Sequence, residues 1–307
     1  MIKYILKRIG IGLLTLLVLA TITFFLMRAI PGSPFAKDDK AIAPEVYAAL
    51  EEKYGLDKPL YEQYLIYFTN AVQGEFGEAI TKPGVFVSDI IVKRAPITAT
   101  LGCIAFVISL VVGISLGVIS ALTKNKIINN FITVIATIGV SLPSFLFAIL
   151  LMILFGVVLR MLPTVGLKTA ESYIMPAATL SLYPISMITR LTRSSLKDVL
   201  KQDYITLAKS KGLNRFTVVV RHGLKNAMLP VITYCGPMFA GLITGSFVVE
   251  RIFTIPGIGA EFITSVQNRD YTLIMGLTIF LGAIVIVMNL ISDLVAVVVD
   301  PRIRLEK

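Results

Sequence analysis

A serine between two glycines is the first pattern in this chain that could do chemistry. Gly113-Ile114-Ser115-Leu116-Gly117 matches G-x-S-x-G, a pattern typical of serine nucleophiles in hydrolases. Such a serine needs a base within hydrogen-bond reach, and the sequence holds a single histidine, His222. Ser115 lies roughly 10 Å inside an apolar helical run, whereas His222 lies in a polar stretch. We therefore expect no catalytic residue, and an intramembrane serine hydrolase is the lesser alternative.

Residue patterns for nucleotide, metal and cofactor chemistry are absent from the sequence. Lysine never directly follows glycine, so no G-x-x-x-x-G-K-[S/T] phosphate loop exists. Cys103 and Cys235 both lie in apolar runs without further metal-ligand or disulfide spacing, and we predict that they are small core residues. No metal site and no cofactor are expected. If ATP drives this protein, another polypeptide must hydrolyse it.

Composition places the chain in a membrane. Of its 307 residues 56% are hydrophobic, and the mean hydropathy is +0.83, well above the values of soluble domains. A helix needs about 20 apolar residues to cross a bilayer. We predict an all-α membrane protein with six transmembrane helices, of which the fourth is the shortest: Ile9 to Ala29, Ile97 to Leu122, Phe131 to Leu159, Met175 to Ile188, Met228 to Val249 and Thr272 to Val299.

The distribution of charge orients these spans. Residues 190–225 carry nine basic and two acidic residues, whereas residues 31–96 carry seven basic and ten acidic ones. Basic loops stay on the cytoplasmic side of a membrane. Both termini and the basic stretch are therefore predicted to be cytoplasmic. The net charge of +10 largely reflects this asymmetry, so it does not call for a nucleic-acid partner.

The first external segment has a pattern of its own. Pro44 begins a predicted short helix that ends at Gly55, and Pro59 begins a second one that runs through Phe68 with one apolar face. Residues 85–93 are predicted to lead into the second span. We interpret the segment as an extracytoplasmic cap that packs on the bundle rather than as a binding element.

Several predicted spans are interrupted by proline, glycine and serine. Irregular backbone inside a membrane is tolerated where it lines a cavity. Small residues also let helices pack closely, as in Gly113-x-x-x-Gly117 and Gly241-x-x-x-Gly245, so packing remains open as an alternative. The candidate residues for a translocation pathway are Ser141, Pro143 and Ser144 in the third span, and Gly236, Gly241 and Gly245 in the fifth.

A polar, basic segment at residues 194–226 separates the fourth and fifth spans. Apolar residues recur at helical spacing from Ser195 to Ala208, Gly212 stands where a left-handed helix cap belongs, and Asn214 can cap a second short helix from Arg215. The predicted unit is helix, tight turn, helix. Its fixed position at the membrane argues against DNA binding, and attraction to anionic lipid explains the lysines but not the capped turn. Docking to a protein is favoured.

The same segment carries a family resemblance. Asp203-Tyr204-x-x-x-Ala208-x-x-Lys211-Gly212-Leu213, followed by His222-Gly223-Leu224-x-Asn226-Ala227-x-x-Pro230, resembles the cytoplasmic loop of binding-protein-dependent ABC importer permeases. The closest resemblance is to the B-type subunit of the oligopeptide and dipeptide family. Further matching stretches follow in order along the chain, from Pro31-Gly32-Ser33-Pro34 through Glu250-Arg251-Ile252-Phe253 and Arg269-Asp270-Tyr271 to Asp300-Pro301-Arg302.

The resemblance implies a type I ABC importer permease fold and a role without catalysis. It implies import of oligopeptides or dipeptides, with nickel, heme or glutathione as cargo alternatives, across a bacterial or archaeal cytoplasmic membrane. The implied partners are a second, C-type permease, two cytoplasmic ABC ATPases, an extracytoplasmic peptide-binding protein and membrane lipid. Coupling to the ATPases is assigned to Asp203, Tyr204, Ala208, Lys211, Gly212 and Leu213.

The expected organisation follows from the spans and the resemblance. It comprises an N-terminal transmembrane helix at 1–30, an extracytoplasmic segment with short helices at 31–94, a permease core with five helices at 95–300 that contains the coupling loop 194–226, and a cytoplasmic tail at 301–307.

Overall fold

The computed structural model describes residues 2–29, 32–35 and 43–299. Within these ranges the chain is helical and forms no strand, and one isolated antiparallel bridge joins Glu78 to Phe86. The predicted all-α class is confirmed. The chain divides into two compact units, residues 1–98 with 256–286 and residues 99–255 with 287–307.

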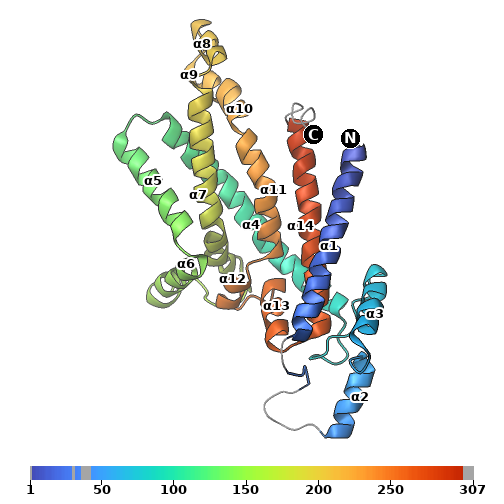
Figure 1. The fold of residues 1–307 in the computed structure, drawn as a ribbon. Helices are drawn as coiled ribbons and strands as arrows, with labels where there is room; N and C mark the ends of the chain where they lie inside the picture. Colours follow the sequence, from blue (N-terminus) through green and yellow to red (C-terminus); the bar gives the residue numbers. More distant parts are fainter. Residues whose placement is uncertain (1, 30–31, 36–42, 300–307) are drawn as a thin grey trace. The chain divides into compact units, whose positions relative to one another are not determined.

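The first unit joins the N-terminal helix to helices from the end of the chain. Its apolar interior includes Ala20, Phe24 and Met275 in one cluster and Val87 and Leu277 in another. The helices that it contains wholly or in part are α1 (Ile2–Ala29), α2 (Pro44–Tyr54), α3 (Leu60–Val72), the start of α4 (Val87–Leu122), α13 (Ile258–Gln267) and the first half of α14 (Tyr271–Val299) (Figure 1).

The second unit is built around α7 (Ile174–Val199), which packs against α5 (Lys126–Ser141), α6 (Ser144–Leu151) and α11 (Leu229–Thr244). One of its apolar clusters joins residues of α4, α7 and α11. Its shorter elements are the π-helix Met152–Val158, the 3₁₀ turn Ala170–Tyr173, α8 (Asp203–Ser210), α9 (Arg215–Thr217), the π-helix Val218–Leu224, α10 (Lys225–Ala227) and α12 (Phe247–Ile252).

Among the residues that the structure describes, four stretches are long and apolar enough to cross a membrane: Ile5–Ala29, Val87–Leu122, Leu229–Ile252 and Tyr271–Val295. The predicted third span is broken, because Lys126–Ser141 and Ser144–Val158 meet at an angle of 109° and form a fifth span only if counted together. The predicted fourth span lies within α7, whose polar residues keep it outside this set. The number of six spans and the orientation of the termini therefore stay predictions.

The predicted external helices are present in the first unit. Gly55 ends α2 in the left-handed conformation with a φ of 65°, and α3 runs from Leu60 to Val72, a turn beyond Phe68. The lead-in to the second span is the first turn of α4, where Val87, Ile90 and Ile91 are buried.

The loop before α4 is closed by Glu78. Its carboxylate accepts a hydrogen bond from the Gly84 N–H and pairs with Lys53 Nζ at 3.1 Å. The Gly84 N–H first, and the Lys53 ammonium after it, hold the pKa of Glu78 below its usual range. Because the charged form is favoured in the folded loop, the contribution is present above the ordinary carboxylate pKa and is lost as the pH falls through the lowered one.

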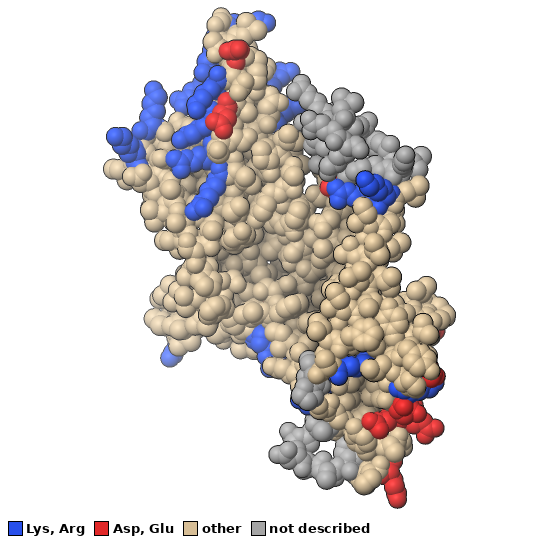
Figure 2. Space-filling view, in the orientation of Figure 1, with Lys and Arg blue, Asp and Glu red and all other residues tan. Residues whose placement is uncertain are grey.

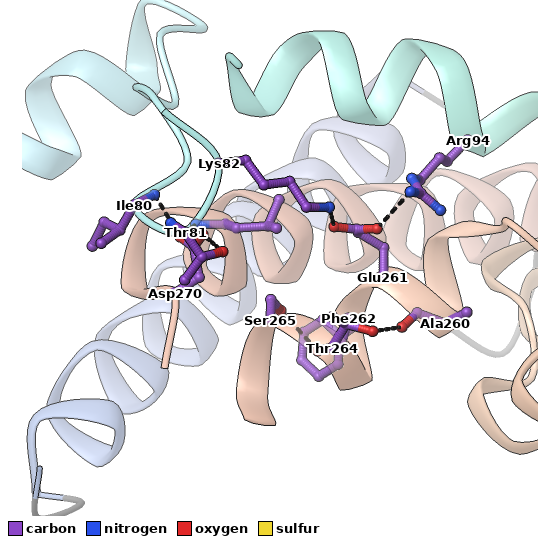
Figure 3. Close-up of polar contacts among 11 residues, drawn as sticks. Ile80, Thr81, Lys82, Arg94, Ala260, Glu261, Phe262, Thr264, Ser265 and Asp270 are labelled. Atoms are coloured by element: carbon purple, nitrogen blue, oxygen red, sulfur yellow. Dashed lines mark hydrogen bonds and ion pairs between the residues drawn. The ribbon is translucent and has the colours of Figure 1, made fainter. Parts of the chain in front are cut away.

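Asp270 ties this loop to α14 (Figure 3). It is fully buried, and its carboxylate accepts hydrogen bonds from the Ile80 N–H (3.1 Å), the Thr81 N–H (2.9 Å) and the Thr81 hydroxyl (2.7 Å). It also accepts from the Leu273 N–H at 3.0 Å, which makes it the N-cap of α14. One side chain thus joins segments 190 residues apart in sequence.

A second buried carboxylate lies on α13. Glu261 is 3% exposed, pairs with Arg94 Nη2 at 2.9 Å and contacts Lys82 Nζ. Figure 3 shows the two cations converging on it from the loop and from α4. Two positive partners offset the desolvation of one buried carboxylate, so α13 is held to both elements by ion pairs rather than by apolar contacts alone.

We expect Asp270→Ala to lower the free energy of unfolding by about 2 to 4 kcal/mol. The substitution removes the cap of α14 and leaves the buried Ile80 N–H and the part-buried Thr81 N–H without their acceptor. Thermal unfolding of the purified protein in detergent measures the change. Asp57→Ala, at an exposed aspartate, is the matched control and should change stability by no more than about 0.5 kcal/mol. Equal effects of the two substitutions would contradict the assignment.

Candidate functional site

The basic segment forms a compact unit at the end of α7. α7 ends at Val199, the chain turns through residues 200–202, and α8 follows. The N–H groups of Lys201 and Gln202 bond three residues back, which tightens the turn. A small apolar core holds α8 on the following π-helix, and its members are Ile205, Ala208 and Val218 with partly buried Leu200.

Gly212 ends α8 as the sequence predicts. Its φ of 76° is left-handed, and a Cβ at this position would meet nothing within 4 Å. The backbone conformation, not the available space, is therefore what favours glycine here. Asn214 then caps the next turn, because its Oδ1 accepts a hydrogen bond from the Thr217 N–H at 2.7 Å.

Two details of the segment differ from prediction. The helix expected to run on from Ser195 is broken between α7 and α8, so Leu207 and Tyr204 are exposed rather than part of one buried face. The second helix is α for Arg215–Thr217 only and continues as the π-helix Val218–Leu224. The cause of the break is the tight turn at 200–202, which rotates α8 relative to α7 and buries Ile205 instead.

Polar contacts fix this unit to the spans. The Asn226 side-chain amide donates to the Tyr204 hydroxyl at 3.0 Å, and Arg215 Nη2 donates to the Leu122 carbonyl, at the end of α4, at 3.2 Å. Gly223 lies against Leu196 of α7, so a Cβ there would approach Leu196 Cδ1 to 3.3 Å. The segment is therefore connected to α4 and α7.

The outer surface of the segment combines apolar and basic side chains. Phe216 is 76% exposed, Leu207 56% and Leu213 40%, and the exposed Lys209 and Lys211 lie beside them in sequence. Figure 2 shows lysine and arginine side chains gathered on the side of the molecule where α5, α7 and α8 lie. Exposed apolar side chains bordered by charge are typical of a protein-docking surface.

Four of the residues predicted for a pathway fall at breaks in the spans. Ser141, Pro143 and Ser144 form the 109° bend between α5 and α6, where Pro143 cannot donate a backbone hydrogen bond and Leu142 is extended. Gly245 has a φ of 87° and ends α11, as an irregular break requires. Among the described residues, no side-chain hydrogen bond or ion pair joins these two groups.

The two other glycines of that set differ in their surroundings. Gly236 packs on α14, because a Cβ there would collide with Ser292, so close helix packing accounts for it. Gly241 faces open space, with nothing within 4 Å of a Cβ. The pathway role of either residue stays a prediction. Cys103, predicted to be a core residue, is exposed, and Cys235 is partly buried; both are free thiols.

The G-x-S-x-G pattern is a packing element. Cβ atoms at Gly113 and Gly117 would lie 2.8 Å from Ile188 Cβ and 2.5 Å from Thr192 Cβ, so the two glycines let α4 approach α7. Ser115, two positions from each glycine, is exposed on another face of α4. The spacing that resembles a nucleophile motif is the spacing of a helix contact.

Sequence reasoning missed two arginines. Arg190, predicted to lie in the basic stretch after the apolar run that ends at Ile188, is part of helix α7, nine residues before the helix ends. Arg190 and Arg193 donate hydrogen bonds to hydroxyls of Thr137 and Thr133 on α5. The two arginines are three residues apart and the two threonines four apart, so each pair lies on one face of its helix. This pattern would have indicated the contact if the predicted helix had continued past Ile188.

Comparisons with known proteins identify the class. The family described as binding-protein-dependent transport system inner membrane component matches residues 113–305, and the N-terminal family of such membrane components matches residues 1–102. The dipeptide transport system permease protein DppB of Bacillus subtilis is 42% identical over 307 residues, covering 100% of this chain and 99% of that protein. The oligopeptide transport system permease protein OppB of Haemophilus influenzae is 41% identical over 306 residues, covering 99% of this chain and all of that protein.

Solved structures agree on the fold. A chain of the inward-facing MetNI methionine ABC transporter superposes with a TM-score of 0.55 at 15% identity, covering 68% of this chain and 96% of that one. A chain of an amino acid ABC transporter with histidines gives 0.53, also at 15% identity, covering 70% and 94%. The class is thus a multi-pass permease component, which transports rather than catalyses. This chain belongs to the family of binding-protein-dependent transport system inner membrane components.

We expect Gly212→Ala to loosen the turn after α8 without a steric clash. An L-residue at this φ costs about 1 to 2 kcal/mol, which corresponds to roughly 5- to 30-fold faster hydrogen exchange across residues 203–217. Gly212→Asn should perturb exchange less, because asparagine tolerates this conformation. Gly241→Ala, at a helical glycine with open space, is the control. Equal exchange in Gly212→Ala and the unsubstituted protein would contradict the assignment.

Proposed function

We propose that this chain is one of two permease subunits of an ATP-driven importer of dipeptides or oligopeptides. The observation that carries the proposal is identity of about 41 to 42% along the entire chain to proteins named as dipeptide and oligopeptide permeases. The whole-length match includes the first unit, not only the core shared with more distant transporters.

The proposed importer contains further subunits. A second, C-type permease would complete the pathway, two cytoplasmic ABC ATPases would supply the energy, and an extracytoplasmic peptide-binding protein would deliver cargo. The proposed location is a bacterial or archaeal cytoplasmic membrane with both termini inside. The division into 1–30, 31–94, 95–300 and 301–307 is proposed on the same basis, with 31–94 as the external cap.

Coupling to ATP is proposed for the segment around α8. Asp203, Tyr204, Ala208, Lys211, Gly212 and Leu213 belong to it. Ala208 is buried in its core and Gly212 shapes its turn, so these two act on the form of the segment, whereas Leu213 is exposed and available for contact. The apolar core and the contacts to α4 and α7 support movement as one body. Movement of the segment couples ATP to transport only if the ATPases bind its two positions with different free energies.

The pathway is proposed to pass the bend at Ser141, Pro143 and Ser144, with Gly236, Gly241 and Gly245 in the facing span. The bend supports this assignment, because a break in a membrane helix frees backbone polar groups that need water or protein partners. The exposed Ser141 and Ser144 hydroxyls would serve passing polar cargo.

Uptake by the reconstituted complex tests the cargo. Proteoliposomes that contain this chain with its second permease, ATPases and binding protein should accumulate labelled dipeptides or oligopeptides, and only with internal ATP. Nickel, heme and glutathione are offered in parallel. Accumulation of one of these in place of peptides would overturn the peptide assignment and leave the permease role intact. Conductance by this chain alone would overturn the dependence on ATPases.

We expect Phe216→Asp to weaken ATPase association about 10- to 100-fold. Burial of a phenylalanine contributes about 1.5 to 3 kcal/mol, and aspartate in its place adds a charge to be desolvated. Association is measured by titrating purified ATPases onto the permease pair in nanodiscs. Val72→Asp, 86% exposed in the other unit, is the matched control and should leave affinity unchanged. Unchanged affinity in Phe216→Asp would remove this residue from the docking surface.

A further inference from the structure

Two arginines of α7 lie along a row of hydroxyl groups on α5. Arg193 Nη1 donates to Thr133 Oγ1 at 2.9 Å, and Arg190 Nη2 donates to Thr137 Oγ1 at 3.1 Å. Thr133, Thr137 and Ser141 recur every four residues, so they share one face of α5, and all three are exposed. We call Arg190, Arg193 and these three hydroxyls the arginine stripe. It ends at the bend where the proposed pathway begins.

The hydroxyl groups of the stripe lie inside the predicted third span, which begins at Phe131. Thr133 and Thr137 are roughly 3 Å and 9 Å along the axis past Phe131, and their contacts bring the guanidinium groups of Arg193 and Arg190 to the same depth. Phe131, Val134 and Ile138, exposed on the same helix, mark the depth as apolar. A charged side chain at such depth is costly against lipid, and in membrane proteins it faces the bundle interior or a water-filled cavity.

The hydrogen bonds that hold Arg190 and Arg193 on α5 do not neutralise their positive charge. Each threonine hydroxyl donates its proton to a carbonyl four residues back, Thr133 to Asn129 at 2.7 Å and Thr137 to Thr133 at 2.8 Å. Each hydroxyl oxygen is therefore free to accept from an arginine, but it brings no negative charge. Among the described residues no carboxylate forms an ion pair with Arg190 or Arg193, so most N–H donors of both guanidinium groups remain available.

The geometry points to a site in the translocation pathway that binds a carboxylate, which we call the carboxylate station. We infer that the arginine stripe takes the terminal carboxylate of the peptide cargo as it passes α5, an inference that rests on the proposed function. The planar guanidinium fork matches a carboxylate in two parallel hydrogen bonds. The hydrogen bonds to the threonines hold both guanidinium groups against α5. Lys124 and Lys126, by contrast, lie at the start of that helix, where they can reach lipid headgroups.

A station of this kind must also release its cargo. The anchoring hydroxyls hold the arginines in position, and Arg190 is exposed, so water competes for the carboxylate and the contact remains weak. Passage requires binding that is favourable enough for entry and weak enough for exit. The two arginines, one helical turn apart, offer successive contacts rather than one deep site.

The test compares a peptide with a free C-terminal carboxylate and the same peptide with a C-terminal amide. Uptake of both is measured in the reconstituted complex, after the affinity of the binding protein for each has been determined, so that delivery can be matched. The unsubstituted complex should transport the free peptide faster. In the double variant Arg190→Gln with Arg193→Gln, uptake of the free peptide should fall about 10- to 100-fold, and the preference should disappear.

Controls separate the outcomes. Lys124→Gln, which removes a cation before α5, should preserve the preference. If the double variant keeps the preference, or if its defect affects both peptides equally and vanishes in vesicles of neutral phosphatidylcholine, the arginines serve lipid or packing and the station is overturned. Should the glutamine variant fail to assemble, Arg190→Lys with Arg193→Lys decides: a reduced preference supports the station, and a full preference overturns it.

Failure of the cargo assignment has a different result. No uptake of either peptide by the unsubstituted complex overturns the peptide assignment and the station with it. A preference for the free peptide that survives in both arginine variants overturns the station alone.

Discussion

Close approach of helices to α7 is the constraint on which the second unit depends. Gly113 and Gly117 admit α4, and Gly139 admits α5, where a Cβ would collide with Ser186 of α7. In a membrane such contacts supply the packing that the hydrophobic effect does not supply between apolar helices. The Thr189 hydroxyl adds a hydrogen bond to the Gly113 carbonyl at 3.2 Å. α4, which crosses α7, and α5 therefore both hold the middle of α7 (Figure 1).

Helix α7 connects the two features that we propose for the transport cycle, the segment that couples to the ATPases and the arginines that bind cargo. The segment around α8 follows directly from its end, and the arginine stripe lies along its face toward α5. A displacement of α8 would reach the stripe through the turn at 200–202 and one continuous helix. The hydrogen bonds of that turn, from the Lys201 N–H to the Asp198 carbonyl and from the Gln202 N–H to the Val199 carbonyl, favour rigid transmission. Coupling of this kind needs two discrete positions of a packed element rather than gradual bending.

The sequence was informative where local rules decide. Pro44 and Gly55 predicted both ends of α2, and Gly212 and Asn214 predicted the turn after α8, because caps depend on a few adjacent residues. The break of the helix from Ser195 was not predicted, since residues 200–202 hold neither glycine nor proline. The contact of Arg190 with Thr137 was missed for a different reason. It depends on how far α7 continues past its apolar run, and only the packing against α5 decides that.

Polar pairing across long separations was equally beyond the sequence. Asp270 stands directly before an apolar helical run, so its role as N-cap of α14 could have been predicted, but its bonds to Ile80 and Thr81 depend on tertiary structure. Glu261, with Lys82 and Arg94 as partners, reads in the sequence as one more acidic residue of an external loop. In the first unit, backbone N–H groups satisfy the buried carboxylate of Asp270, and two cations neutralise that of Glu261. The arginines of the stripe have no carboxylate partner among the described residues. Charge that a fold neutralises has a structural explanation, and charge that it holds in place but leaves unneutralised points to a ligand.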